Sequence, residues 1–389
     1  MYETGHPVSR RGAMLTGAGL ALAGLGLAGP PARAAVRGTG RARTIRPVAR
    51  SVRSASLTTQ QQAGQRVIAS YSGLTPPDSL LSQISAGEVA GVIFITGNIS
   101  SESQISSVIQ QFVAANADSP VPSPLLLMTD QEGGEVNRLP GAPSMSEKQI
   151  GEASDFQSEA SQAGTGAGQN LAGVGMNTDL APVLCVYRQA GDFLDQYQRS
   201  YSMNANQVAL CGQAFVTAMQ QTGVVPTAKH FPGLGAATAS QDTDVEPVVL
   251  NIPLATLRSV DEVPYRPVIA APIQMIMVSW ATYPALDAAY PAGMSSAVVQ
   301  GELRSYLGYS GVTITDALEA GAVSGFGDTS VTSVMAASAG MDLLLCASGD
   351  PSQAQQAVTA LAGALTSGQL DSGDFTAAVQ RVDSLRSGL

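Results

Sequence analysis

The sequence predicts an α/β fold, a single (β/α)8 barrel of the TIM type over residues 58–389. Eight short apolar runs bounded by Gly or Pro alternate with amphipathic stretches, which is typical of parallel strands that are buried on both faces and joined by helices. Polar residues end several of these runs, at the positions where such a barrel carries its active site. The predicted strands are 65–70, 91–96, 124–130, 176–183, 225–230, 274–280, 311–316 and 341–347.

The amphipathic stretches between the runs predict helices, for example at 101–115, 207–221 and 297–307. An open, doubly wound sheet is the alternative architecture, because periodicity does not reveal whether a sheet closes. No Gly-x-Gly-x-x-Gly motif follows the first predicted strand, which argues against the dinucleotide-binding version of that alternative.

Three predicted strands end in polar residues that suit a binding site. They end in Asp130-Gln131-Glu132, in Lys229-His230 and in Thr315-Asp316. Carboxylates, together with the guanidinium of Arg138 eight residues after Asp130, bind the hydroxyl groups of a polyhydroxylated ligand well. Asp316 has two possible roles, a helix cap or a nucleophile directed into the barrel mouth, and spacing does not decide between them.

Composition and charge limit the kinds of partner and cofactor that the protein is expected to bind. The chain has 389 residues and a net charge of −10. From residue 58 onward, 11 basic side chains face 29 acidic ones, a net charge of −18, so we expect no nucleic-acid partner. The three cysteines lie far apart, and a single histidine in the body does not supply a multi-histidine cluster, so we expect no metal and no other cofactor.

The N-terminal region has the pattern of an export signal. Paired arginines, Arg10 and Arg11, precede an uncharged stretch at 12–29, and Ala32-Arg33-Ala34 forms a small-x-small cleavage pattern. We therefore predict a twin-arginine signal peptide at 1–34, a disordered linker at 35–57, and a bacterial protein that is secreted or held at the cell surface. We expect a monomer without a membrane span after cleavage.

Six motifs in order resemble the N-terminal domain of glycoside hydrolase family 3, in particular its single-domain β-N-acetylglucosaminidase (β-hexosaminidase) branch. The resemblance covers about residues 60–388. The motifs are DQEGGEVNRL, NTDLAPVL, QRSYS, AKHFPG, YPAL and TDALEAGAV.

This resemblance implies a TIM barrel that cleaves a terminal β-linked N-acetylglucosamine with retention, through a covalent glycosyl-enzyme. It implies that Asp316 is the nucleophile, and the chemistry agrees, because an aspartate can form and release a glycosyl ester. By the same motif matching, the sugar-binding set consists of Asp130, Arg138, Arg199, Lys229 and His230.

The sequence departs from the family pattern at the proton donor. That branch carries a His between two glycines after AKHFPG, and then an Asp-x-His whose His is the general acid/base. Here Leu234 replaces the first His, and the downstream region, 240–244, contains none. The carboxyl groups of Asp242, Asp244 and Glu246 are the candidate replacements. We rank Asp242 first, because it is nearest the missing His, and Asp244 second.

Cys185 is a further departure, since related sequences tend to carry Asp there. The expected function is a secreted glycosidase that removes terminal β-linked N-acetylglucosamine from cell-wall or chitin-type glycans. Loss of general acid catalysis typically costs ~10²–10⁴ in rate. Three alternatives therefore stay open: activity on good leaving groups only, a glycan-binding pseudoenzyme, and a β-glycosidase with a different sugar preference.

Overall fold

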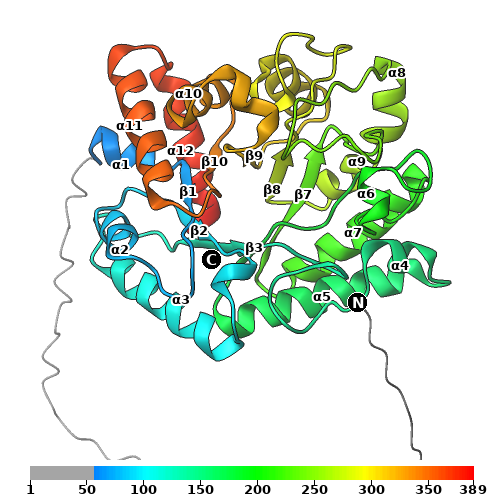
Figure 1. Cartoon of the computed structure of the whole chain (residues 1–389), viewed down its shortest axis with the longest axis horizontal. Coiled ribbons are helices and arrows are strands. Elements are labelled where there is room, and N and C mark those ends of the chain that lie inside the picture. Colours follow the sequence, from blue (N-terminus) through cyan, green and yellow to red (C-terminus); the bar gives the residue numbers. More distant parts are fainter. Residues whose placement is uncertain (1–56) are drawn as a thin grey trace, which may run out of the picture. The chain divides into compact units, whose positions relative to one another are not determined.

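The computed structural model describes residues 57–389. The predicted signal at 1–34 and the predicted linker, apart from its last residue, lie outside the described residues. Figure 1 shows strands at the centre of this body and helices around them. The helical elements are α1 (Thr59–Gly64), α2 (Asp78–Ser85), η1 (Thr96–Asn98), α3 (Glu102–Ala117), α4 (Glu147–Glu152), α5 (Phe156–Val174), α6 (Phe193–Gln196), α7 (Ala205–Gln220), α8 (Leu254–Thr256), η2 (Leu257–Asp261), α9 (Tyr265–Ala270), η3 (Ala292–Met294), η4 (Ala297–Tyr306), η5 (Gly321–Phe326), α10 (Thr329–Ala339), α11 (Pro351–Ser367) and α12 (Ser372–Arg386).

Eight strands form a closed parallel barrel in the order β1-β10-β9-β8-β7-β6-β3-β2. Each of the eight predicted runs contains or overlaps one of them, so the prediction of a (β/α)8 barrel is confirmed and the open sheet is wrong. The barrel strands are β1 (Val67–Ala69), β2 (Gly91–Ile93), β3 (Leu126–Thr129), β6 (Thr178–Asp179), β7 (Val225–Phe231), β8 (Met275–Val278), β9 (Val312–Ala317) and β10 (Leu343–Leu345). A separate antiparallel pair, β4 (Gln131–Gly133) and β5 (Val136–Asn137), follows β3.

The predicted helices are present with small shifts at their ends. The stretch at 101–115 forms α3, which begins after Ser101, whose side chain accepts a hydrogen bond from the Gln104 backbone N–H. The stretch at 207–221 forms α7, which is capped in the same way by Asn204. The stretch at 297–307 forms η4, which is wound as a π-helix.

The core has two layers, as a barrel requires. Apolar side chains between strands and helices form the larger cluster. A smaller cluster fills the barrel interior, with buried side chains from alternate strand positions such as Leu126 and Met128 in β3 and Val312 and Ile314 in β9. Side chains within a strand point alternately inward and outward. The inward position that follows these apolar residues therefore lies at the carboxyl end of each strand.

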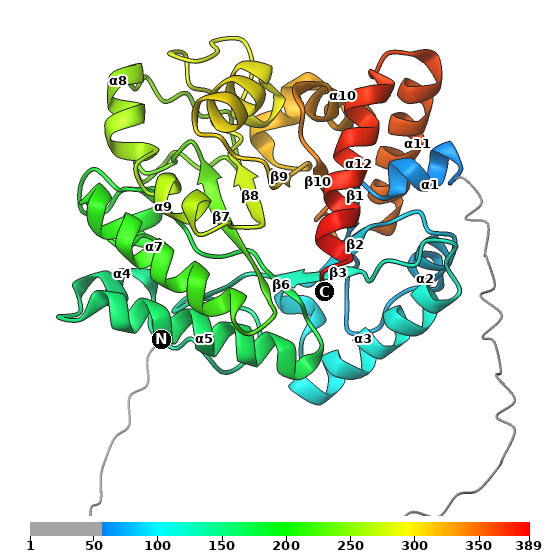
Figure 2. The ribbon, with the colours of Figure 1, turned by 180° about the vertical axis from the view of Figure 1, so that it is seen from behind.

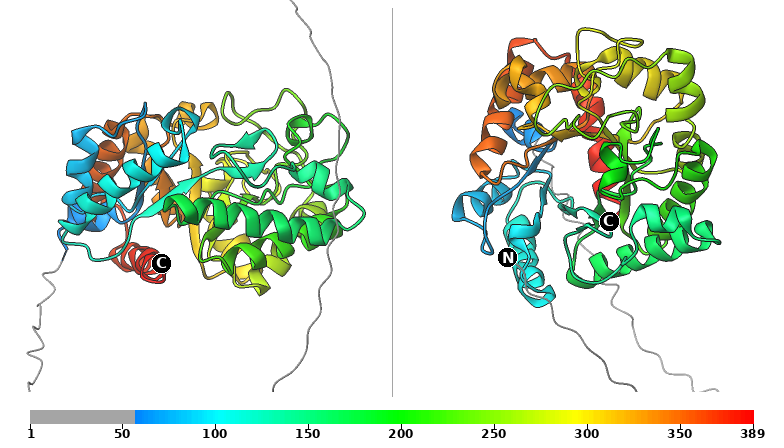
Figure 3. Two further views of the ribbon diagram at one scale, coloured as in Figure 1. Left: turned by 90° about the horizontal axis from the view of Figure 1, so that it is seen from below. Right: turned by 45° about the vertical axis from the view of Figure 1, so that its right-hand side comes forward.

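Helix α12 closes the end of the barrel at which the strands begin, opposite their carboxyl ends. Figure 2 shows it, in red, in front of the strands, and Figure 3 shows it projecting from one end of the molecule. Its Val382 packs into the interior cluster, and its Arg386 donates to the carbonyls of Ser123 and Pro124, just before β3. The base of the barrel is therefore sealed, which leaves the carboxyl ends of the strands as the open face.

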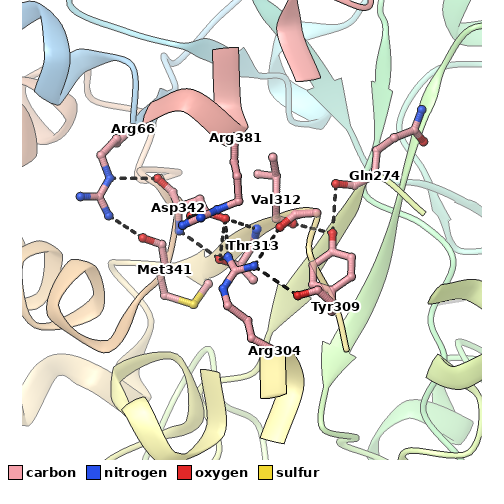
Figure 4. A network of polar contacts seen from close by, with 10 residues as sticks. Arg66, Gln274, Arg304, Tyr309, Val312, Thr313, Met341, Asp342 and Arg381 are labelled. Carbon is pink, nitrogen blue, oxygen red and sulfur yellow. Dashed lines mark hydrogen bonds and ion pairs between the residues drawn. The ribbon is translucent and has the colours of Figure 1, made fainter. Parts of the chain in front are cut away.

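A buried carboxylate holds this base together (Figure 4). Asp342, just before β10, lies 2.7 Å from Arg304 of η4 and 2.8 Å from Arg381 of α12. It also accepts hydrogen bonds from the backbone N–H and the hydroxyl of Thr313. Because both oxygens are paired, the charge of Asp342 can be buried beside two arginines.

Candidate active site

The alternation of side chains directs three of the predicted site residues into the barrel mouth. In β3 the inward positions Leu126 and Met128 are followed by Asp130. In β9 the inward positions Val312 and Ile314 are followed by Asp316. Lys229 occupies the equivalent position near the end of β7. One carboxylate, one ammonium group and a second carboxylate thus converge from three strands.

These side chains line a pocket with a volume of about 200 Å³ at the carboxyl ends of the strands. The whole set of site residues expected from the sequence lines it. That set is Asp130, Arg138, Arg199, Lys229, His230, Asp242, Asp244 and Asp316. Glu246, the third candidate for the proton donor, is exposed and is not part of the lining.

Glu132 joins the cationic part of the site, although the sequence analysis left it out of the binding set. Its carboxylate accepts two hydrogen bonds from Arg199, at 2.8 and 2.9 Å. The same carboxylate lies 2.7 Å from the Lys229 ammonium, which also lies 2.7 Å from Asp130. Bidentate pairing of this kind fixes the direction of the guanidinium. Its place in DQEGG, right after a strand end, was the available signal.

The β4–β5 hairpin positions Glu132. Asp179 of β6 accepts a hydrogen bond from the Gln131 backbone N–H at 2.9 Å, which fixes the start of the hairpin. Gly133 and Gly134 both have positive φ, and their Cα atoms pack directly against the chain at Met145 and Ser146. A side chain at either position would overlap those atoms. It would also be strained, because a positive φ is unfavourable for residues other than glycine.

The charges in this network are fixed at neutral pH. Burial alone would raise the pKa of Glu132, but Arg199 and Lys229 outweigh burial and lower that pKa to about 2. Burial would lower the pKa of Lys229, but Asp130 and Glu132 raise it. Burial, together with the charges of Lys229 and Arg199, lowers the pKa of His230 well below its usual value, so its imidazole is neutral.

Asp316 titrates differently from these groups. Burial is the main cause, and the charge of Asp244 is the second cause, of a rise in its pKa to about 7. One oxygen of Asp316 accepts a hydrogen bond from the backbone N–H of Ala317 at 2.8 Å, which acts in the opposite direction. Asp244 is exposed at the rim of the pocket, and its partial desolvation there, together with the charge of Asp242, raises its pKa in turn. The pocket thus holds two carboxyl groups that disfavour each other's ionisation.

Asp242 and Asp244 occupy different places in the loop that follows β7. The Asp242 side chain accepts a hydrogen bond from the Asp244 backbone N–H at 2.9 Å, and the Asp242 carbonyl accepts from the N–H groups of Val245 and Glu246. The Asp242 side chain therefore braces a turn, as Asp often does. Asp244 sits two residues further on, and its charge is felt by Asp316.

The two other departures from the family pattern, Cys185 and Leu234, contact each other, and Leu234 lines the pocket. The Leu234 backbone N–H lies 3.2 Å from the Cys185 sulfur, and the His230 N–H lies 3.5 Å from it. Burial raises the pKa of the Cys185 thiol to about 12, so it stays protonated and uncharged. This part of the site is therefore uncharged at neutral pH.

No group of three or more His, Cys, Asp or Glu side chains in residues 57–389 is arranged to hold a metal ion. None of the helices there has the length and apolar character needed to cross a bilayer.

A closed (β/α)8 barrel with paired carboxylates and cations in one pocket at its open face is an arrangement that glycoside hydrolases share with other barrel enzymes. The sequence profile described as the glycosyl hydrolase family 3 N-terminal domain matches residues 60–385. The chain therefore belongs to glycosyl hydrolase family 3, and it is an enzyme of the glycoside hydrolase class.

Individual relatives agree with this assignment. The chain is 44% identical over 330 residues to a protein of Arthroderma benhamiae named an uncharacterized secreted glycosyl hydrolase, covering 84% of this chain and 93% of that one. It is 29% identical to the β-hexosaminidase A of Pseudoalteromonas piscicida, with 86% of this chain covered. A solved family 3 β-N-acetylglucosaminidase of Paenibacillus sp. superposes with a TM-score of 0.81 at 31% identity and 86% coverage. The chain spans only 62% and 63% of the lengths of these last two enzymes.

Proposed function

We propose that this protein is a retaining exo-glycosidase that removes a terminal β-linked N-acetylglucosamine, with Asp316 as nucleophile and Asp244 as general acid/base. The observation that carries the proposal is that both carboxyl groups line one pocket together with the cations and carboxylates of the predicted sugar-binding set. Relatives named for β-hexosaminidase and β-N-acetylglucosaminidase activity support the choice of sugar. The small pocket volume, about 200 Å³, suits one sugar residue and hence cleavage at a chain end.

The first step needs an ionised nucleophile. The carboxylate of Asp316 attacks the anomeric carbon, the glycosidic C–O bond breaks, and a glycosyl ester forms on Asp316. Asp130, Arg138, Arg199, Lys229 and His230 would bind the hydroxyl groups and hold the ring in register. Neutral His230 would act as one more hydrogen-bond partner and not as a cation.

The second group must deliver and then remove a proton. A carboxylic acid at the position of Asp244 protonates the leaving oxygen in the first step, and its carboxylate then takes a proton from the water that hydrolyses the ester. We propose Asp244 in place of Asp242, which ranked first on sequence position, for two reasons. The Asp242 side chain is engaged in the turn, and of these two aspartates only Asp244 is among the main causes of the raised pKa of Asp316. The first step needs Asp244 protonated and Asp316 ionised, so the proton that this coupled pair shares must reside on Asp244 when the substrate is bound.

We also propose that the natural substrates are cell-wall or chitin-type fragments outside the cell. The secreted status in the name of the Arthroderma relative and the N-terminal signal pattern support export. Mass spectrometry of protein from the culture medium should find an N-terminus near Ala35. An intact Met1 in cytoplasmic protein only would argue against export.

Activity is tested with aryl β-N-acetylglucosaminides that carry a good leaving group, because these need little acid assistance. We expect turnover by the wild type and loss of turnover in Asp316→Ala. Asp374→Ala, which removes an exposed carboxylate on α12, is the matched control. Aryl β-glucosides and β-N-acetylgalactosaminides assayed in parallel would reveal a different sugar preference.

Trapping the intermediate tests the mechanism directly. A fluorinated N-acetylglucosamine analogue whose glycosyl ester hydrolyses slowly should add one sugar mass to the peptide that contains Asp316. Product analysis by NMR should show the β-anomer first. A sugar that binds without any turnover or labelling would instead support the glycan-binding alternative.

A further inference from the structure

Gly321 lies where the loop that carries Asp244 contacts the segment just after β9, the strand that carries Asp316. It is the first residue of η5, five residues after Asp316. Its backbone N–H donates to the Asp244 carbonyl at 2.8 Å, and the next N–H, of Ala322, donates to the Thr243 carbonyl at 3.0 Å. These two hydrogen bonds join the 243–244 segment to the β9–η5 connection. Loop and nucleophile therefore share one rigid support.

The contact leaves no room for a side chain at Gly321. A Cβ atom built there would overlap the carbonyl group of Val245 and would lie 3.0 Å from the backbone nitrogen of Glu246. The obstacle is backbone, which cannot rotate away as a side chain can. Ordinary backbone angles at Gly321 do not require a glycine, so its lack of a side chain matters because of this close approach.

The neighbouring residues of the loop support a docked arrangement. Thr243 is buried and lines the pocket, whereas Val245, which follows Asp244, is 72% exposed. The loop thus has one residue directed into the pocket and one directed to solvent, on either side of Asp244. A loop held in this way keeps Asp244 at a defined distance from Asp316.

We infer that Gly321 is a positioning residue, one that sets the separation between the Asp244 acid and the Asp316 nucleophile by docking the 243–246 backbone against η5. This inference rests on the proposed function of those two carboxyl groups. In carboxylate-pair retaining enzymes that separation is ~5–5.5 Å, and a misplacement of about 1 Å can cost ~10²-fold in rate.

The test compares Gly321→Ala with Gly325→Ala. Both glycines lie in η5, but a Cβ at Gly325 meets no atom within 4 Å, so this variant is the matched control. A second variant, Ala322→Pro, removes the N–H that bonds the Thr243 carbonyl and puts the proline ring in its place. The substrates are aryl β-N-acetylglucosaminides with good and with poor leaving groups.

For Gly321→Ala we expect kcat/KM to fall ~10²-fold on the poor leaving group, but less than about 3-fold on the good one, which needs little acid assistance. Ala322→Pro should show the same selectivity, and Gly325→Ala should match the wild type. An equal loss on both substrates, or no loss on either, would overturn the inference. Retained turnover of the good substrate shows that the variant is folded.

Hydrogen exchange separates this inference from the proposed function. The backbone amides of residues 321 and 322, which donate the two docking hydrogen bonds, should exchange faster in Gly321→Ala than in Gly325→Ala, whether or not the protein turns over substrate. Unchanged exchange would contradict the docking itself. Faster exchange in a protein that hydrolyses neither substrate would contradict the proposed function, and with it the positioning role, but not the docking.

Discussion

Arg199, which lines the pocket, and Glu132, which does not, form a bidentate ion pair with N–O distances of 2.8 and 2.9 Å. The second interaction of Glu132, with Lys229, joins Arg199 to the strand end that carries His230. Glu132 lies outside the pocket lining, but its carboxylate holds the two cations, Arg199 and Lys229, that are proposed to bind the sugar. The pair is buried on the Glu132 side, so its geometry depends on complete pairing.

Glu132→Gln should weaken substrate binding more than it slows chemistry. The variant retains the size of the side chain but loses its charge, so Arg199 and Lys229 lose their common anchor. Hydrogen bonds to charged groups contribute about 1.5–3 kcal/mol, so KM should rise ~10–100-fold. Steady-state kinetics on an aryl glycoside measures the change. Glu135→Gln, exposed at the turn of the same hairpin, should leave KM unchanged. A fall in kcat without a rise in KM would contradict this prediction.

Asp342→Ala should destabilise the barrel without altering the chemistry. It leaves Arg304 and Arg381 unpaired at the base, far from the open face, and breaking a buried ion pair costs ~3–5 kcal/mol. The midpoint of thermal unfolding, followed by circular dichroism, should therefore drop by several degrees. Below that temperature kcat/KM should equal the wild-type value. Asp118→Ala, at an exposed position, is the control. An unchanged midpoint would show that the network adds no net stability.

The sequence was sufficient to predict what depends on local pattern. Apolar runs identified all eight barrel strands, and polar residues at strand ends identified Asp130, Lys229 and Asp316, because alternation along a strand carries directly into the barrel. It could not predict features that depend on contacts between distant segments. The sealing of the base by α12 is one such feature.

The choice between Asp242 and Asp244 as proton donor also depends on contacts between distant segments. Sequence position favoured Asp242, because it lies nearest the missing family histidine. The hydrogen bonds that distinguish the two residues run from Asp242 to its own turn and from η5 to the Asp244 carbonyl, 77 residues away in sequence. No periodicity or motif encodes such a pairing. The pairing of Glu132 with Arg199 and Lys229 could not be predicted for a similar reason, because its partners lie on two other segments of the barrel.

Leaving-group dependence should separate the roles of the two loop aspartates. In Asp244→Ala, kcat/KM should fall ~10²–10⁴-fold on a poor leaving group and little on a good one, because only the former needs its oxygen protonated. Azide, which attacks the glycosyl ester without a general base, should raise kcat of this variant on the good substrate. Asp242→Ala should lose activity on both substrates alike, through a loosened turn, and should not respond to azide. The opposite pattern would restore Asp242 as the acid.

The pH profile should report the charge that Asp244 places on Asp316. Burial and the Asp244 charge raise the pKa of Asp316 to about 7, and Asp316 attacks only when ionised. For a good leaving group, kcat/KM of the wild type should therefore rise with pH through about 7, since this parameter reports the free enzyme. Asp244→Asn removes the negative neighbour, which makes Asp316 easier to ionise, so the same limb should move to lower pH. Asp242→Asn is the matched control, since Asp242 is not among the main causes of the shift at Asp316, and its limb should move less. If the limb of Asp244→Asn stays at the wild-type pH, the two carboxyl groups do not interact, and Asp244 does not face the nucleophile.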